Sequence, residues 1–386
     1  MTLNPRSYAA LLMLLVLMLA PITQAQVILR AEHQGQAFVV EQLVDGLGVT
    51  WGMAWVGPQR LLLSQRDGRV RLLELDSGRL TEIGGAPRVR ASGQGGLLDL
   101  VVGPETSQSG SGDGSLRWLY FTYSKPQDGV GLTTLARARL QAEQLVDWQD
   151  LLVTRSGSSS DRHYGSRIAF DGQGHLFFSI GDRGDRPNGQ DLSTHAGSIL
   201  RLNLDGSVPA DNPFQGRRGA LPQIWSYGHR NPQGLAYDPQ QQRLWAIEHG
   251  PRGGDELNLI LAGANYGWPL VSYGKEYWAP LQVGEGTHRD GTEQPAKVYT
   301  PSIAPSSLLF YQGDAFEQWR GNLFAGALKL QHLNRLVLDP QGKVIEEQRL
   351  LTELGERIRA LLQGPQGWLY LSTDSGKLLR LRPASS

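Results

Sequence analysis

The stretch SRIAFDGQGHLFFSIGDRG (residues 166–184) carries the pattern that decides the fold. It contains an apolar run, a turn built from Asp and Gly, a second apolar run and a further Gly-rich turn. Both runs are short and rich in Leu, Ile and Phe, which is typical of β-strands bounded by turn residues. The segment therefore predicts two neighbouring antiparallel strands joined by a tight turn.

The same pattern recurs along the rest of the chain. Further copies occupy residues 51–75, 97–126, 232–250, 321–343 and 358–383. Each of these six units has room for one four-stranded antiparallel sheet, so the sequence predicts an all-β protein, a six-bladed β-propeller. Because blades cannot bury their faces alone, residues 26–386 are expected to form a single domain. A pair of β-sandwich domains is the alternative, and residues 140–152 are the one candidate for a helix.

The composition favours a turn-rich β protein and excludes several partners. The chain has 48 Gly, 21 Pro and 10 Trp, and Lys plus Arg balance Asp plus Glu at 37 each. With no charge excess, neither a nucleic acid nor an anionic membrane surface is an expected partner. There is no Cys, so the fold must be stabilised by its core, a metal or a cofactor rather than by disulfides.

Residues 1–25 have the features of a secretory signal peptide. A short basic start, Met1–Arg6, precedes the apolar run Ala9–Ala20, and a small residue, Ala25, ends the segment. The apolar run is too short for a comfortable membrane span. We therefore expect a cleaved signal and no stable membrane insertion afterwards, with an uncleaved anchor as the alternative.

Two segments are too polar to be core strands. They are GHRNPQG (228–234) and EHGPRGGDELN (248–258), and both are expected to be loops at the mouth of the β scaffold. A Gly-Pro pair beside an Asp-Glu pair offers backbone carbonyls and carboxylates, which are the donors that calcium prefers. The alternative is a tight turn with acidic residues on the surface.

Positive charges near the C-terminus suggest an anion site. Arg357 and Arg359 are two residues apart, so on a strand their side chains point to the same face. A carboxylate matches the fork geometry of such guanidinium groups. Lys329 and Arg230 are further candidates for the same site. Ordinary surface charges remain the alternative for all four.

His163 is the candidate general base. An imidazole suits abstraction of a hydroxyl proton near neutral pH, and Asp182 closes the strand that follows and could orient it. A merely exposed loop histidine is the alternative. The sequence contains no G-x-S-x-G elbow, no Cys nucleophile and no H-E-x-x-H pattern, which argues against a serine hydrolase and a tetrahedral zinc site.

Taken together, these motifs resemble the soluble, periplasmic quinoprotein aldose sugar dehydrogenases, which use pyrroloquinoline quinone (PQQ) and calcium. The resemblance covers Val49 to Arg382. It is carried by GQGGLLDL (93–100), GSRIAFDGQGHLFFSIGDRG (165–184), QDLSTHAGSILRLNLDGSVPADNPF (190–214), SYGHRNPQGLAYDP (226–239), EHGPRGGDELNLI (248–260), NYGWP (265–269), GALK (326–329) and GERIR (355–359).

The resemblance implies a propeller with PQQ over its central channel, and it implies roles for individual residues. His163 would remove the proton of the anomeric hydroxyl while hydride passes to the quinone, and Arg230 would stabilise the developing charge. Calcium held by the carbonyls of Gly250 and Pro251 would polarise the quinone. The other implied cofactor contacts are Gln94, Asn231, Tyr277, Lys329, Arg357 and Arg359, and a second calcium would bind at Glu256 and Tyr266.

The resemblance therefore predicts a periplasmic enzyme that oxidises the C1 hydroxyl of aldoses to lactones and passes electrons to an unidentified quinone or periplasmic carrier. A non-catalytic sugar- or protein-binding propeller and a calcium-dependent lactonase are the alternatives. Two residues depart from the family pattern. Ala360 replaces an aspartate, so a charge that would steady the arginines is expected to be missing. Arg162 adds a cation that would lower the pKa of His163 or contact the substrate.

Overall fold

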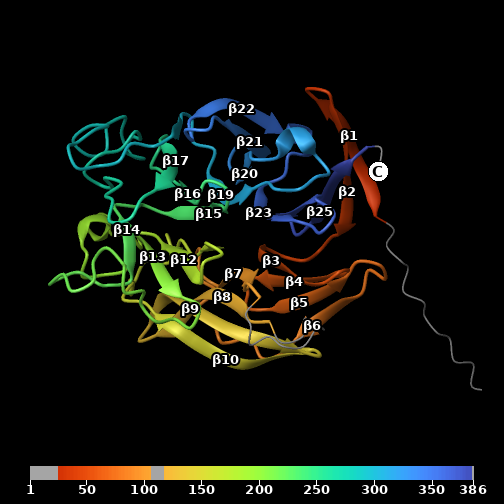
Figure 1. The fold of residues 1–386 in the computed structure, drawn as a ribbon, viewed down its shortest axis with the longest axis horizontal. Helices are drawn as coiled ribbons and strands as arrows, with labels where there is room; N and C mark the ends of the chain where they lie inside the picture. The colour runs from red at the N-terminus through yellow and green to blue at the C-terminus, as the bar shows by residue number, and fades with distance from the viewer. Residues whose placement is uncertain (1–24, 106–116, 385–386) are drawn as a thin grey trace, which may run out of the picture.

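The computed structural model describes residues 25–105 and 117–384. Their strands form six antiparallel sheets arranged around a central axis, each occupying a sector of the molecule (Figure 1). The prediction of an all-β, six-bladed propeller is confirmed. Residues 1–24 of the predicted signal peptide lie outside the described residues, as do residues 106–116. Within the described part of the chain, no helix is long and apolar enough to cross a membrane.

Three blades are built from residues 50–227, and their strands run outward from the axis in chain order. Blade 1 contains β3 (Thr50–Gly57), β4 (Arg60–Gln65), β5 (Val70–Glu74) and β6 (Leu80–Ile83). Blade 2 contains β7 (Leu97–Val102), β8 (Leu119–Gln127), β9 (Val130–Gln141) and β10 (Gln144–Val153). Blade 3 contains β11 (Ile168–Phe170), β12 (His175–Ile180), β13 (Ser198–Asn203) and β14 (Ile224–Tyr227).

The remaining blades complete the ring. Blade 4 contains β15 (Pro232–Asp238), β16 (Arg243–Glu248), β17 (Asp255–Ile260) and β18 (Lys297–Tyr299). Blade 5 contains β19 (Pro305–Phe310), β20 (Leu323–Ala327), β21 (His332–Leu338) and β22 (Val344–Leu350). Blade 6 contains β23 (Ile358–Gln363), β24 (Leu369–Thr373), β25 (Leu378–Pro383), β2 (Gln36–Val44) and β1 (Gln26–His33). Three short 3-10 helices are η1 (Arg186–Gln190), η2 (Glu317–Trp319) and η3 (Thr352–Leu354).

The ring closes in blade 6, where strands from both ends of the described chain pair. β2 lies antiparallel to β25, with Val40 opposite Leu381 (Figure 1). Arg380 and Arg382 both donate to the buried carboxylate of Glu41, at 2.8 and 3.0 Å. β1 then pairs with the outer edge of β2, so this blade has five strands where four were predicted. The extra strand covers an edge that would otherwise expose unpaired backbone groups.

The helix considered for residues 140–152 is wrong. The segment contains the end of β9, a turn at which Ala142 has a left-handed φ of 51°, and most of β10. Leu145 lies opposite Leu140 in the antiparallel ladder. The turn at Ala142 breaks the apolar spacing that suggested a helix, and both leucines instead pack against the core between blades 1 and 2.

The innermost strand of each blade lines the axis. At one end of the channel, these strands enclose a cavity of about 500 Å³. We call this cavity the lower cavity. Its wall is mostly apolar and includes Met53, Val101, Ala169, Leu235, Leu308 and Leu361. At the other end, the loops that precede the innermost strands come together, and the candidate site lies among them.

Candidate active site

His163 lies in the connection between β10 and β11 and is held at both its backbone and its side chain. Its backbone N–H donates to Gln94 Oε1 at 2.7 Å, and its φ of 55° is left-handed. Its Nδ1 is 2.7 Å from Asp182 Oδ1, so the contact expected between these two residues is present. A non-glycine residue in this backbone region is strained, and such strain is commonly found at functional sites.

Asp182 is fixed by further donors, so it can orient the imidazole. Its Oδ1 also accepts from Gly184 N at 2.7 Å, and its Oδ2 accepts from Trp268 Nε1 at 2.8 Å. Because the Asp182 carboxylate accepts a hydrogen bond from Nδ1, the neutral imidazole carries its proton on Nδ1. The lone pair of Nε2 is then available.

The surroundings of His163 keep the ring neutral at neutral pH. Burial lowers the pKa of His163 below its usual range; the hydrogen bond that its ring donates to Asp182 opposes this effect, and the nearby charges of Arg230 and Arg162 add to it. The expected influence of Arg162 on the pKa of His163 is therefore present. A neutral, oriented imidazole is the form required of a general base.

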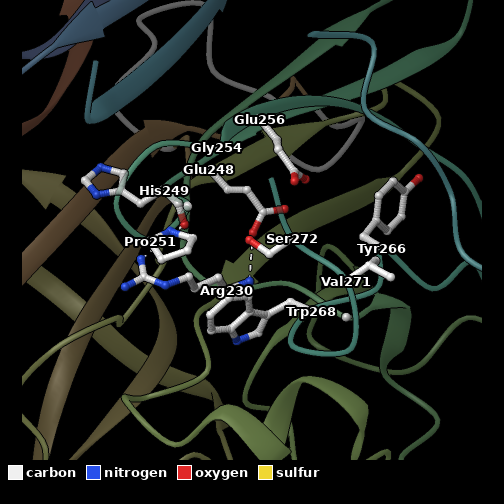
Figure 2. A pocket seen from close by; sticks show the side chains of 12 residues that line it. Arg230, Glu248, His249, Pro251, Gly254, Glu256, Tyr266, Trp268, Val271 and Ser272 are labelled. Atoms are coloured by element: carbon white, nitrogen blue, oxygen red, sulfur yellow. Dashed lines mark hydrogen bonds between the residues drawn. The ribbon is translucent and has the colours of Figure 1, made fainter. Parts of the chain in front are cut away.

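Arg230 is nearly buried, and hydrogen bonds from both its backbone and its side chain hold it in place. Its N–H donates to Glu248 Oε2 at 2.7 Å, and its Nη1 donates to the carbonyl of His249 at 3.2 Å. The guanidinium lies 5.4 Å from the centre of the Trp268 ring (Figure 2). Arg230 is thus a fixed positive charge between the His163 loop and the turn at Gly250.

Behind Arg230 lies a serine–histidine–glutamate chain that sequence spacing did not reveal. His229 Nδ1 is 2.8 Å from Glu248 Oε1, and its Nε2 is 2.9 Å from Ser226 Oγ. This spacing is that of a hydrolase triad, but Ser226 is fully buried, with 0% of its surface exposed. Without access for a substrate, the chain holds Glu248, and through it Arg230.

Four of the predicted cofactor residues line one pocket of about 360 Å³, which we call the cationic pocket. Arg357 and Arg359 come from the start of blade 6, Gln94 from the loop before β7, and Asn231 from the loop before β15. Its full lining also includes Val49, Trp51, Arg66, Gly93, Gln233, His249, Ala304, Leu328 and Asp374. The size is in the range of small-molecule sites, and the three arginines suit an anionic ligand.

A carboxylate lies between the two C-terminal arginines. Arg357 Nε donates to Asp374 Oδ2 at 2.9 Å, and Arg359 donates to both Asp374 oxygens at 2.7 and 2.9 Å. Burial would raise the pKa of Asp374, but the bonds from these arginines lower it below its usual range. The expectation that Ala360 leaves the arginines without a steadying charge is therefore wrong, because the turn after β24 supplies that charge.

Two predicted cofactor residues do not line the cationic pocket in the described structure. Lys329 is exposed and follows Leu328, whose carbonyl accepts from Arg357 at 3.0 Å. Tyr277 is 66% exposed near the tip of a small hairpin in which Lys275 pairs with Gln282. That hairpin is tied to η1 by a two-bond ion pair between Arg186 and Glu276 at 2.7 Å.

The four predicted calcium residues line a second, neighbouring pocket, which we call the acidic pocket. Gly250, Pro251, Glu256 and Tyr266 all contribute to its wall. Figure 2 shows the carboxylates of Glu248 and Glu256 pointing toward its interior. Asp255 turns away from it, because its carboxylate accepts from Gly250 N, Ser302 Oγ and Ala304 N at 2.8–2.9 Å and so holds the turn.

The acidic pocket has the chemistry of a site for a hard cation. Burial raises the pKa of Glu256, and the nearby Glu248 carboxylate raises it further. Asn258 donates to both glutamates, and its buried Oδ1 has no hydrogen-bond partner among the described residues. Within residues 25–105 and 117–384, no group of three or more His, Cys, Asp or Glu side chains could hold a metal. A cation here would therefore depend on carbonyl oxygens, as calcium sites commonly do.

Several residues that build the site were not selected from the sequence. Trp268, Glu248 and Asp374 each bind a predicted residue that lies on another strand or loop. The NYGWP and EHGPRGGDE motifs were the available signals for Trp268 and Glu248. No local pattern singles out Asp374, because its partners lie 15 and 17 residues away across a turn.

Comparisons with known proteins agree with this geometry. The family model described as "Glucose / Sorbosone dehydrogenase" matches residues 47–380. The aldose sugar dehydrogenase YliI of Escherichia coli (strain K12) is 40% identical over 352 residues, which are 89% of this chain and 92% of that protein.

Solved structures give the same result. The apo-form crystal structure of the soluble aldose sugar dehydrogenase of Escherichia coli has a TM-score of 0.84 at 39% identity, covering 89% of this chain and 99% of that one. The PQQ-bound aldose sugar dehydrogenase of Streptomyces coelicolor has a TM-score of 0.71 at 27% identity, covering 88% and 96%. The chain therefore belongs to the glucose/sorbosone dehydrogenase family of sugar oxidoreductases.

Proposed function

We propose that the protein is a PQQ- and calcium-dependent dehydrogenase that oxidises the C1 hydroxyl of aldose sugars to lactones. The carrying observation is that Gln94 binds the backbone of His163 and also lines the cationic pocket. A neutral base is thereby fixed beside a pocket suited to an anion. The PQQ-bound relative from Streptomyces coelicolor supports PQQ as that anion.

The cationic pocket fits PQQ, a flat molecule with three carboxylates. Arg357 and Arg359 would hold carboxylates by charge-assisted hydrogen bonds, and Gln94 and Asn231 would offer neutral polar contacts. We propose that Lys329 and Tyr277 contact the cofactor from outside the described pocket wall. When bound, PQQ supplies the quinone that accepts the hydride of C1.

The acidic pocket fits calcium. The carbonyls of Gly250 and Pro251 would hold one ion near Arg230, and Glu256 and the carbonyl of Tyr266 would hold a second. Calcium supplies a Lewis acid that polarises an oxygen of the acceptor.

The protein's own residues handle the proton and the charge. His163 Nε2 takes the proton of the C1 hydroxyl, and Asp182 stabilises the imidazolium that results. Arg230 offsets the negative charge that develops during transfer, and its backbone bond to Glu248 keeps it in place. Trp268 connects the His163–Asp182 pair to Arg230, since its Nε1 donates to Asp182 and its ring faces Arg230.

We further propose that the protein is exported to the periplasm through residues 1–25 and that it passes its electrons to a quinone or a periplasmic carrier. The basic start, apolar run and Ala25 end of that segment support export.

Dye-linked oxidation of a panel of aldoses tests the proposed function. We expect the purified mature protein to reduce the dye only with both PQQ and calcium, and to lose activity after treatment with a calcium chelator and regain it with added calcium. A folded protein that is silent with every sugar would favour the non-catalytic binding propeller. Lactone hydrolysis that needs calcium but not PQQ would favour the lactonase.

The pH dependence of kcat/KM tests the environment of His163. Its pKa is lowered, so the rate is expected to fall only when the pH drops through that lowered value and the base becomes protonated. Arg162→Gln removes a cation that lowers this pKa, so the acid limb should move to higher pH. Because Arg162 is exposed, the difference between variant and wild type should shrink at high salt. An acid limb that stays in place, or moves to lower pH, would contradict this account.

A further inference from the structure

Arg167 precedes β11 and extends its buried side chain across the central channel. Its guanidinium contacts the innermost strand of each of the other five blades. The five partners are Trp51 O at 2.8 Å, Asp99 Oδ1 at 3.0 Å, Gln233 O at 2.9 Å, Ser306 O at 2.6 Å and Arg359 O at 3.0 Å. One side chain therefore joins blade 3 to blades 1, 2, 4, 5 and 6.

The carbonyls that Arg167 binds are free for a local reason. In four blades, the pairing of the innermost strand with its neighbour shifts register at the residue whose carbonyl Arg167 binds. The four are Trp51, Gln233, Ser306 and Arg359. A bulged residue is left out of the sheet ladder, so its carbonyl needs another donor. Arginine alone carries five N–H groups in a planar fork, and it can satisfy several carbonyls at once.

The charge of Arg167 is balanced within the same layer. Its Nη1 contacts Asp99, whose second oxygen accepts from Ile168 N at 2.9 Å. A buried cation is tolerated only when it is paired and fully hydrogen-bonded. Arg167 is therefore both satisfied and fixed, and the layer that it forms is rigid.

The layer formed by Arg167 and its partners separates the cationic pocket from the lower cavity. Along β3, Trp51 lines the cationic pocket, and Gly52 and the residues after it line the lower cavity. Along β23, Arg359 lines the cationic pocket, and Ala360 lines the lower cavity. Arg167 itself lines the lower cavity, so its guanidinium forms the partition beneath the cationic pocket.

Two of the residues that Arg167 binds form one wall of the cationic pocket. The guanidinium of Arg359 stacks 4.4 Å from the centre of the Trp51 ring, and it is also bound to Asp374. The two Nη atoms of Arg167 hold the backbones of Trp51 and Arg359, respectively. The position of the stacked pair therefore depends on Arg167.

We propose that Arg167 is a positioning residue for cofactor binding: it fixes Trp51 and Arg359 so that the Arg359 guanidinium is placed to receive an anionic carboxylate. This inference rests on the proposed function, because it takes PQQ as the anion. A loosened wall would reduce affinity for the cofactor, whereas His163 and Arg230, which carry out the chemistry, are not bound to Arg167.

The test compares PQQ affinity with stability in the apo-protein. The double variant Arg167→Met/Asp99→Asn removes both buried charges together, so that neither is left unpaired. PQQ is titrated into each protein while tryptophan fluorescence is followed, and thermal unfolding is measured without PQQ. We expect the Kd for PQQ to rise by about tenfold or more, as is typical when a supporting residue of a ligand site is lost. At saturating PQQ, kcat should stay within about twofold of the wild-type value.

Two further variants keep the test decisive. Arg335→Met is the matched control: Arg335 is a buried arginine bound to Asn322, Gln348 and the carbonyl of Gln318, away from the channel. It should lower the unfolding temperature and leave the Kd for PQQ unchanged. Arg167→Lys keeps the positive charge beside Asp99 but lacks the planar fork that reaches both Trp51 O and Arg359 O, so it should raise the Kd by a smaller factor even if the double variant does not fold.

The outcomes separate this inference from the proposed function. If wild type binds PQQ and the two Arg167 variants bind it equally well, Arg167 is only structural and the inference is overturned, while the proposed function stands. If wild type does not bind PQQ at all, both are overturned.

Discussion

Replacing His163 by Gln is expected to lower kcat by about 10²–10⁴-fold, the contribution of a positioned general base, while PQQ binding is kept. The structure gives the reason. His163 is neutral, its Nδ1 faces Asp182, and its Nε2 is left to take the hydroxyl proton. Glutamine can still donate to Asp182 but has no basic nitrogen. Steady-state kinetics at saturating PQQ give kcat, and a fluorescence titration gives the Kd for PQQ.

A second histidine–aspartate pair provides the matched control. His175 Nδ1 lies 2.7 Å from Asp171 Oδ2, but this pair belongs to the turn between β11 and β12 and lines neither pocket described above. His175→Gln makes the same chemical change outside the site, and it should leave kcat within about twofold of wild type. Near-normal turnover in His163→Gln, or an equal loss in both variants, would show that His163 is not the base.

Arg359→Met is expected to weaken PQQ binding by on the order of 10²–10³-fold, and Arg357→Met by about tenfold or less. Both arginines bind Asp374, but the Arg359 side chain is only 10% exposed whereas that of Arg357 is 46% exposed. A charge contact shielded from water is stronger than one that water screens. Equilibrium titration of each apo-variant with PQQ measures the two affinities.

Asp374 adds a second contribution to the Arg359 variant. Without Arg359, its carboxylate keeps only Arg357 as a partner and repels the carboxylates of the ligand. The double variant Arg359→Met/Asp374→Asn should therefore bind PQQ more tightly than Arg359→Met alone. Equal affinity losses in the two single arginine variants would contradict the different burial of these side chains.

The fold could be predicted because each blade corresponds to its own repeat of apolar runs and turns in the sequence. The apolar runs and turns at residues 166–184 and their five counterparts are local features, and they map onto the blades directly. The same holds for His163 and Asp182, which lie 19 residues apart on either side of a hairpin. It also holds for Arg357 and Arg359, whose spacing places them on one face.

The remaining features depend on contacts that no pattern of residue types in the sequence identifies. Asp374 reaches Arg359 across a turn, and Glu248 holds Arg230 through its backbone. Neither contact leaves a spacing that could be recognised in advance. Arg167 is the extreme case, since its partners extend from Trp51 to Arg359, and only the closed ring brings them together.

The most direct test of the account is the absorption spectrum of the PQQ-loaded protein after anaerobic mixing with an aldose. We predict that the quinone absorbance is lost in a single turnover, at a rate that accounts for kcat, and that lactone forms in equal amount. A 1,5-anhydro sugar, which lacks the C1 hydroxyl, should leave the spectrum unchanged. A folded, PQQ-loaded protein whose spectrum no aldose alters would contradict the assignment of this site as an aldose-oxidising centre.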